Sequence, residues 1–304
     1  MAKQDFLSLL DLPIEDLDYL IQRGRTLRKM HEAGELYQPL VGKTGALILQ
    51  MNSTRTRVAF EAGFSQLGGH ALFLGTSDTQ IGRGEPIPDL ARVLSEMVNV
   101  IMIRTLDQDN IAQLAAHATV PVINAMSSLL HPCQLLADVQ TFEELRGPIA
   151  GANVAFIGDG YNMCHSYIHA ARQWGFKLKI ACPPKHYPNA EILNSTNNAE
   201  MVDSTVEAVT DADLVVTDVW SSMGHESQEQ DRRATFADYQ VSEALLDNAS
   251  KDVLFMHCLP AHRGEEVNES VLDDPRTVVW QEAGNRLHSQ KALLEFVLLG
   301  RIES

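Results

Sequence analysis

Short apolar runs alternate with amphipathic helical patterns along almost the whole of this 304-residue chain. Several of the runs are apolar at consecutive positions, which is typical of parallel strands that are buried on both faces. Alternation of strands and helices indicates an α/β fold built on parallel sheets. We therefore expect strands at residues 46–50, 71–74, 100–103, 120–123, 154–157, 178–181, 214–217, 253–256 and 278–280.

The length of the chain favours two domains over one. Gly147, Pro148 and Gly151 separate a long helical pattern from a fresh strand pattern, and we place the domain break there. The first domain is expected to cover residues 1–147, together with a C-terminal helix over residues 285–304 that packs back on it. The second domain is expected to cover residues 148–284. Each domain is predicted to be a parallel sheet flanked by helices.

Composition excludes several classes of partner. The net charge of -16 argues against nucleic acid and anionic membranes, which both require a basic face. Every apolar run falls short of the roughly 18 residues that span a bilayer, and the first residues have no long apolar core, so we expect no membrane span and no signal peptide. The cysteines are widely spaced and match no zinc pattern, which predicts a reduced, cytoplasmic enzyme without a metal. They are Cys133, Cys164, Cys182 and Cys258.

Hydroxyl and guanidinium groups are concentrated at residues 53–57, between a predicted strand and a predicted helix. The free N–H groups at a helix N-terminus bind anions, and Ser53 is a good N-cap residue. Arg55 and Arg57 add bidentate donors suited to phosphate. This segment predicts a site for a phosphate-bearing substrate. An ordinary capped helix with solvated arginines is the alternative that the residue types alone leave open.

Two further strand ends carry polar groups. Arg104 follows the predicted strand 100–103, at the carboxyl edge where open α/β sheets bind ligands. Pro132 fits the first turn of a helix, so His131 and Gln134 lie together at its N-terminus and both can donate to an oxygen. Taken separately, a surface arginine and a helix-capping histidine explain these residues equally well or better.

Gly158 and Gly160 follow the predicted strand 154–157 and precede a helical pattern, as in half of a dinucleotide-binding fingerprint. The third glycine position holds Met163, and the next predicted strand lacks the acidic residue that would hold a ribose. These two departures disfavour a nicotinamide cofactor.

Asp218 directly follows the predicted strand 214–217, where a carboxylate can pair with an ammonium group. Ser222 and Gly224 suit a loop that folds over a ligand, and the polar residues 225–233 extend it. For residues 225–233 a plain surface loop is a fair alternative.

Cys258 follows the predicted strand 253–256 and has His257 and His262 nearby, which by itself suggests zinc or a nucleophile. His257 and Cys258 are adjacent, and adjacent side chains in an extended chain point to opposite faces. We therefore expect them not to share a metal.

Four strings together resemble the ornithine enzymes of the aspartate/ornithine carbamoyltransferase family, over essentially the whole chain and in the family order. The resemblance implies transfer of the carbamoyl group of carbamoyl phosphate to the δ-amine of L-ornithine, giving L-citrulline and phosphate, without a cofactor. It also implies a homotrimer or a multiple of one, with shared active sites. Alternatives are an aspartate or putrescine carbamoyltransferase, a nicotinamide dehydrogenase and a non-catalytic family member. The strings are Ser-Thr-Arg-Thr-Arg at 53–57, His-Pro-Cys-Gln at 131–134, Ser-Met-Gly at 222–224 and His-Cys-Leu-Pro at 257–260.

The resemblance assigns roles residue by residue. The sequence departs from the family pattern at Tyr161, His225 and Gly284, and Arg57 is expected to be a structural residue. Carbamoyl phosphate is expected at Ser53, Thr54, Arg55, Thr56, Gln80, Arg104, His131, Gln134 and Arg286. Ornithine is expected at Asn162, Asp218, Ser222, Met223, Cys258 and Leu259. The catalytic groups are expected to be Arg104, His131, Asp218, Cys258 and Arg286.

Overall fold

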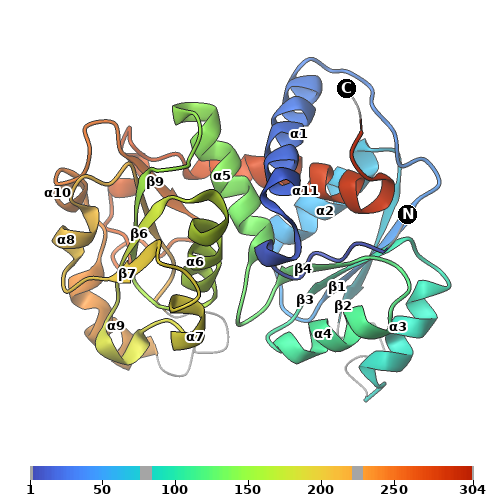
Figure 1. The fold of residues 1–304 in the computed structure, drawn as a ribbon, viewed down its shortest axis with the longest axis horizontal. Coiled ribbons are helices and arrows are strands. Elements are labelled where there is room, and N and C mark those ends of the chain that lie inside the picture. The colour runs from blue at the N-terminus through green and yellow to red at the C-terminus, as the bar shows by residue number, and fades with distance from the viewer. Residues whose placement is uncertain (1–2, 76–83, 221–228, 303–304) are drawn as a thin grey trace. The chain divides into compact units, whose positions relative to one another are not determined.

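The computed structural model of the chain describes residues 3–75, 84–220 and 229–302 (Figure 1). The chain forms two compact units, one of Met1–Gln140 with Gly284–Ser304 and one of Thr141–Ala283. It leaves the first unit within helix α5 (Pro132–Arg146) and returns within helix α11 (Val279–Leu299). The glycine that marks the sequence break, Gly147, comes directly after α5 and has a φ of 86°.

The first unit contains a four-stranded parallel sheet with the strand order β2-β1-β3-β4. Its strands are β1 (Thr44–Leu49), β2 (His70–Gly75), β3 (Val100–Arg104) and β4 (Val122–Met126). Its remaining helices are α1 (Ile14–Glu32), α2 (Thr54–Gln66), α3 (Ile87–Ser95) and α4 (Gln108–His117). Helices α3 and α4 cover one face of this sheet, and α1, α2 and α11 lie on the other side (Figure 1).

The two faces of β1 pack differently. Ile48 belongs to a buried cluster with Leu90 of α3 and Leu114 of α4. On the opposite face Gly45 lies against the ring of Phe64 in α2, and a Cβ at this position would come within 2.6 Å of that ring. Because successive strand residues face opposite sides, one strand holds both helical layers.

Helix α11 packs back on the first unit, as predicted. Arg23 of α1 forms a bidentate ion pair with the buried carboxylate of Glu295 at 2.6 and 2.9 Å. Lys291 donates to Gln66 of α2 at 3.1 Å, and its stem lies near Gly63. These contacts tie the end of the chain to the helices on one side of the first sheet.

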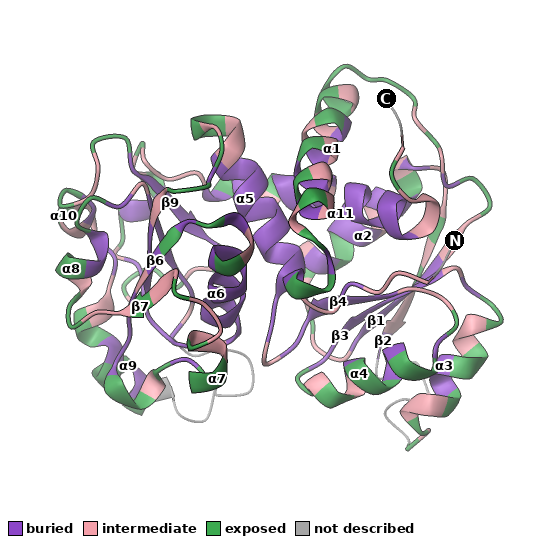
Figure 2. Ribbon diagram, in the orientation of Figure 1, coloured by how far each residue is buried: buried purple, intermediate pink, exposed green. Residues whose placement is uncertain are grey.

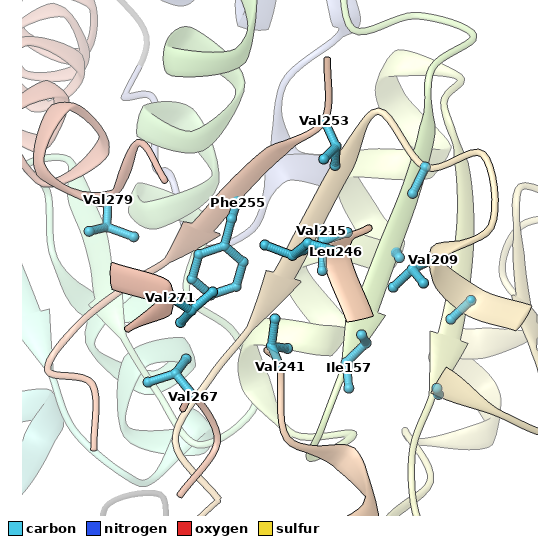
Figure 3. Close-up of a cluster of buried hydrophobic side chains, with 14 of the residues drawn as sticks. Ile157, Val209, Val215, Val241, Leu246, Val253, Phe255, Val267, Val271 and Val279 are labelled. Carbon is cyan, nitrogen blue, oxygen red and sulfur yellow. The ribbon is translucent and has the colours of Figure 1, made fainter. Parts of the chain in front are cut away.

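The second unit contains a five-stranded parallel sheet with the order β7-β6-β5-β8-β9. Its strands are β5 (Asn153–Ile157), β6 (Lys177–Ala181), β7 (Ala199–Met201), β8 (Leu214–Thr217) and β9 (Leu254–His257). Its helices are α6 (Asn162–Trp174), α7 (Ala190–Leu193), α8 (Thr205–Val209), α9 (Glu229–Phe236) and α10 (Glu243–Leu246). Figure 3 shows Val215 and Phe255 of adjacent strands packed with Val209, Leu246 and Val271.

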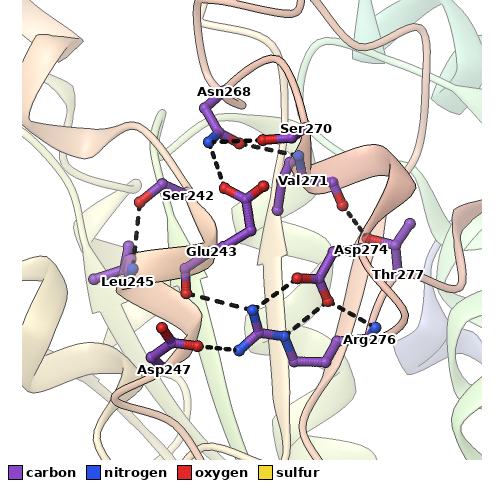
Figure 4. A network of polar contacts seen from close by, with 10 residues as sticks. All are labelled: Ser242, Glu243, Leu245, Asp247, Asn268, Ser270, Val271, Asp274, Arg276 and Thr277. Atoms are coloured by element: carbon purple, nitrogen blue, oxygen red, sulfur yellow. Dashed lines mark hydrogen bonds and ion pairs between the residues drawn. The ribbon is translucent and has the colours of Figure 1, made fainter.

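A polar network fixes the segment between β9 and α11 (Figure 4). Arg276 bonds Asp274 at 2.7 Å and Asp247, which directly follows α10, at 2.8 Å. Asn268 donates to the carboxylate of Glu243 and accepts from the Val271 N–H. The chain that follows β9 is therefore anchored to α10.

All the predicted strands except one are confirmed, with ends moved by a few residues. The strand predicted at residues 278–280 is wrong, because Thr277 makes only an isolated bridge with Phe255 and α11 begins at Val279. The apolar run there begins a helix whose Trp280 is 62% exposed. Strand β7 was not predicted, because its Ala-Glu-Met sequence has no β-branched residue. Within the described ranges, no helix combines the length and apolar character needed to cross a membrane.

Candidate functional site

The carboxyl ends of three adjacent strands meet at one edge of the first sheet. Leu49 of β1 pairs with Arg104 of β3, which pairs with Met126 of β4. Helix α2 follows β1 and α5 follows β4, so both helix N-termini begin near this edge. Figure 2 shows β3 and β4 buried throughout, whereas the edge strand β2 is partly exposed. Ligand sites of open α/β sheets lie at this kind of edge.

Ser53 caps α2 as predicted, because its hydroxyl accepts from the Thr56 N–H at 3.3 Å. Thr56 is buried, and its Oγ1 accepts from Nη1 of Arg104 at 3.5 Å. Arg55 is half-buried and Thr54 is exposed. The first turn of α2 thus offers backbone N–H groups and hydroxyls beside a buried guanidinium, which is a favourable setting for an anion.

Helix α5 brings a second set of donors. His131 directly precedes its first residue, Pro132, and is buried. Gln134, in the first turn, donates to Asp138 at 2.8 Å and accepts from Arg286 of α11. Because α11 runs unbroken through the exposed Gly284, this departure from the family pattern leaves Arg286 bonded to Gln134.

His131 lies among three arginines. Burial, followed by the charges of Arg286, Arg104 and Arg55, holds the pKa of its imidazole well below the usual value. At neutral pH the ring is therefore uncharged and keeps one N–H to donate. Four of the predicted residues together supply three fixed positive charges and a neutral donor at one place.

Arg57 faces a different partner. Its guanidinium lies 3.9 Å from the ring centroid of Phe73 in β2, and it pairs with Glu61 at 3.2 Å. Stacking of a cation on an aromatic ring fixes α2 against β2. Arg57 thus has the packing contacts of a structural residue.

In the second unit the register again aligns the strand ends. Ile157 of β5 pairs with Thr217 of β8, which pairs with His257 of β9. The next residue on β8 is Asp218 and the next on β9 is Cys258. Both side chains therefore leave the sheet at its carboxyl edge.

The turn after β5 requires its glycines. Gly158 has a φ of 125°, and a Cβ on Gly160 would lie 2.4 Å from the carbonyl oxygen of His186. This tight turn delivers Asn162 as the buried first residue of α6. Met163 occupies the third position of the fingerprint, where a dinucleotide site has a glycine. Its side chain is buried in α6.

Asp218 and Cys258 contact each other. The Cys258 thiol donates to Oδ1 of Asp218 at 3.1 Å, and the same oxygen accepts from the Val219 N–H at 2.8 Å. Burial raises the pKa of the Asp218 carboxyl, while His257 and the two hydrogen bonds oppose this shift. A buried carboxylate beside a thiol is equipped to bind and orient an amine.

The expectation that His257 and Cys258 point apart is wrong. Donor atoms of Asp218, His257 and Cys258 all lie within 4.8 Å of one another. Side chains alternate only along a strand, but β9 ends at His257 and Leu259 already has a φ of 57°. Both ring nitrogens of His257 are engaged, since Nδ1 accepts from the Leu259 N–H and Nε2 faces Glu266. A metal would have to displace one of these contacts.

Three predicted site residues, Gln80, Ser222 and Met223, lie outside the described residues. Sequence reasoning missed a buried ion pair between Arg232 of α9 and Asp159 of the turn after β5. Burial raises the pKa of the Asp159 carboxyl to about 6, against the lowering by Arg232. These two residues are far apart in sequence, and no local pattern could have paired them.

Two family models match the chain. One, described as the carbamoyl-P binding domain of aspartate/ornithine carbamoyltransferase, matches residues 4–144. The other, described as the Asp/Orn binding domain of aspartate/ornithine carbamoyltransferase, matches residues 150–297. Together they cover nearly the whole chain, and each corresponds to one of the two sheets.

Curated relatives and solved structures agree with the models. The ornithine carbamoyltransferase of Chromohalobacter salexigens is 54% identical over 305 residues, covering 100% of both chains. That of Psychrobacter sp. (strain PRwf-1) is 53% identical over 304 residues, covering 100% of this chain and 99% of the relative.

Two solved structures extend the comparison to the fold. The ornithine carbamoyltransferase of Pyrococcus furiosus has a TM-score of 0.94 at 43% identity and covers 99% of each chain. The structure from Burkholderia thailandensis E264 has a TM-score of 0.91 at 48% identity, covering 98% of this chain and 100% of the other. Identity at this level over the full length leads to one conclusion: the chain belongs to the aspartate/ornithine carbamoyltransferase family.

Proposed function

We propose that this chain transfers the carbamoyl group of carbamoyl phosphate to the δ-amine of L-ornithine, giving L-citrulline and phosphate. The observation that carries the proposal is the buried group formed by His131, Arg104 and Arg286 beside the capped N-terminus of α2. A small dianion is the ligand that such a set of donors favours. The curated relatives, which cover the full length, support ornithine as the second substrate.

We assign carbamoyl-phosphate binding to residues 1–147 with 285–304, and ornithine binding to residues 148–284. Ser53, Thr54 and Arg55, with Gln80, would hold the phosphate, whose charge grows as the C–O bond breaks. The N–H, hydroxyl and guanidinium groups of residues 53–55, at the N-terminus of α2, support the role of these three residues.

The carbamoyl carbon must be made electrophilic. Thr56, Arg104, His131 and Arg286 would donate to its carbonyl oxygen, with Gln134 holding Arg286 in place. Fixed donors aimed at developing charge are usually the largest catalytic contribution. The lowered pKa of His131 lets it act as a neutral donor without adding a fourth positive charge.

The amine of ornithine must lose a proton before it attacks, because a free alkyl amine has a pKa of about 10.4. Asp218 and Cys258, which share a hydrogen bond, would orient the amine and relay its proton, with the leaving phosphate as the acceptor. Asn162, Ser222, Met223 and the Leu259 carbonyl would hold the rest of the amino acid. No metal or organic cofactor takes part in this scheme.

A comparison of three amines tests the proposal. The protein is incubated with carbamoyl phosphate and with ornithine, aspartate or putrescine, and the carbamoylated products are measured. We expect citrulline formation from ornithine, with kcat/KM at least about a hundredfold above the other two amines, since a site built for a polar group rejects an analogue that lacks it. Carbamoyl-aspartate or carbamoyl-putrescine as the main product would overturn the choice of substrate.

We also propose a homotrimer, or a multiple of one, whose neighbouring subunits share active sites. The partly exposed edge strand β2 supports an interface, since Leu72 is 42% exposed and Val58 on the adjoining α2 is 57% exposed. Unpaired strand edges and exposed apolar side chains are typical of surfaces that another chain covers.

Subunit mixing tests the sharing of sites. An inactive Gln80→Ala protein and an inactive Asp218→Asn protein are denatured together, refolded and assayed. Mixed trimers would contain some sites with neither change, so we expect up to about a quarter of the normal activity to return. Complete absence of rescue, with trimers present by light scattering, would contradict shared sites.

A cytoplasmic location and a role in arginine metabolism belong to the same proposal. The four cysteines all lie in the described part of the chain and none forms a disulfide, which agrees with a reducing compartment. Activity confined to an extracellular fraction would contradict it.

A further inference from the structure

A histidine and a glutamate form a fully buried pair next to Cys258 and Leu259, two of the proposed ornithine-binding residues. Nε2 of His257 lies 3.0 Å from Oε1 of Glu266, and both side chains have no exposed surface. His257 is the last residue of β9, so it directly precedes Cys258 and Leu259. The proposed reaction assigns no task to either member of the pair.

The contacts of His257 fix where its proton resides. Its Nδ1 receives a hydrogen bond from the Leu259 N–H at 2.8 Å, so Nδ1 must present a lone pair. The proton of the neutral ring is therefore on Nε2, where it is donated to the carboxylate of Glu266. The second hydrogen bond of a histidine sets its tautomer, and here that partner is Glu266.

Glu266 also contacts His262, at the far end of the segment 257–262 that begins with His257. The oxygen that accepts from His257 accepts from the His262 N–H at 2.6 Å. The backbone carbonyl of Glu266 accepts from the Val241 N–H at 2.8 Å, which anchors the residue itself. One buried carboxylate oxygen thus joins the first and last residues of the segment 257–262.

Within the segment 257–262, the backbone of Leu259 has an uncommon conformation. Leu259 has a φ of 57°, a left-handed conformation that is uncommon for a bulky residue other than glycine. Its N–H is the group that donates to Nδ1 of His257. If Nδ1 carried the proton, two donors would face each other and the Leu259 peptide would have to turn.

We propose that Glu266 and His257 are positioning residues, which lock the imidazole in its Nε2–H tautomer and so aim the Leu259 carbonyl and the Cys258 thiol at the amine of the substrate. The inference rests on the proposed function, because it assigns a support to the ornithine side of that site. Neither residue touches the substrate in this scheme.

Substitutions at Glu266 test the lock. Glu266→Gln keeps an oxygen that accepts from His257 and His262, so the tautomer and the ornithine kinetics should be retained. Glu266→Leu removes that acceptor, and we expect kcat/KM for ornithine to fall about tenfold to a hundredfold. The KM for carbamoyl phosphate should stay unchanged in both. Val267→Ala, a neighbouring cavity substitution in a buried residue, serves as the control that lowers stability without changing ornithine kinetics.

A second pair of variants keeps the test open if Glu266→Leu does not fold. The Oδ1 of His257→Asn can replace Nδ1 as the acceptor for the Leu259 N–H, whereas His257→Leu has no acceptor. We expect His257→Asn to retain at least about five times the kcat/KM for ornithine of His257→Leu, since an unmade buried hydrogen bond is costly. Equal values for the two would overturn the proposal.

The tautomer itself can be observed with ¹⁵N-labelled histidine. The imidazole ¹⁵N shifts should show the proton on Nε2 of His257 in the unchanged protein and in Glu266→Gln, and its loss from Nε2 in Glu266→Leu. A proton on Nδ1 in the unchanged protein would refute the lock, whatever the activity. If the unchanged protein forms citrulline but Glu266→Leu has normal ornithine kinetics, only the positioning role of Glu266 and His257 is refuted. If the unchanged protein forms no citrulline, the proposed function fails, and the tautomer measurement still tests whether Glu266 fixes the imidazole of His257.

Discussion

Replacing Arg104 with methionine is expected to remove carbamoyl-phosphate binding detectable by calorimetry and to lower kcat at least about a hundredfold. Arg104 is 7% exposed and bonds the buried hydroxyl of Thr56, so its charge acts where little water screens it. Methionine keeps the length of the aliphatic stem but none of the donors. Titration calorimetry with carbamoyl phosphate, followed by steady-state kinetics, gives both values.

Arg92 of α3 provides the matched control for this change. Its guanidinium pairs with Asp89 at 2.9 Å and its side chain is 61% exposed, so Arg92→Met should leave the affinity for carbamoyl phosphate unchanged. The Arg104 variant has a second readout, because the charge of Arg104 lowers the pKa of His131. Without it that pKa should rise, which a histidine NMR titration measures. Normal affinity for carbamoyl phosphate in Arg104→Met would remove Arg104 from the site.

Asp218→Asn is expected to lower kcat/KM for ornithine about a hundredfold to a thousandfold, while the affinity for carbamoyl phosphate is retained. Positioned proton-transfer groups contribute effects of about this size. Asn keeps an oxygen for the Val219 N–H and the Cys258 thiol but has no charge to attract the ammonium form of the amine. Exposed Asp203, changed to Asn, is the control. Normal ornithine kinetics in Asp218→Asn would eliminate the proposed role.

The pH dependence of the same variant follows from the raised pKa of Asp218. The unchanged enzyme should lose kcat/KM for ornithine as the pH falls through this raised pKa, and the Asn variant should lack that acid limb. The stability of the folded protein depends on pH in the opposite direction to kcat/KM. A pKa raised in the folded state means that stability is greatest below the ordinary value of 3.8 and is lost as the pH rises through the raised pKa. Asp218→Asn should therefore raise Tm at pH 7, and the difference should shrink in acid.

The fold was predictable because its signals are local. Consecutive buried residues such as Ile101, Met102 and Ile103 mark a strand covered on both faces, and the alternation with helices fixes the class. Errors arose where a short segment carries the wrong signal. Val279 belongs to an apolar run that begins a helix, and the sequence of β7 contains no residue type that favours strands.

The site was predictable in part for the same reason. The position of Arg104 and Asp218 at strand ends, beyond which ligands bind in parallel sheets, singled out these two residues, whereas Cys258 was singled out by its neighbouring histidines and the His-Cys-Leu-Pro string. The sequence could not give the direction of Cys258, because the chain turns at Leu259 and the alternation of a strand no longer applies. Nor could it find Glu266, because its contacts with His257 and the His262 N–H form only in the folded chain.

The sequence by itself determined the class of fold, the family and the strand ends that carry polar groups, because these depend on periodicity and on short strings of neighbouring residues. Only the tertiary structure decided that His131 is uncharged among three arginines, that the Cys258 thiol meets Asp218, and that Nε2 of His257 faces the carboxylate of Glu266. Such properties depend on burial and on charges brought together from distant parts of the chain, which no local pattern records.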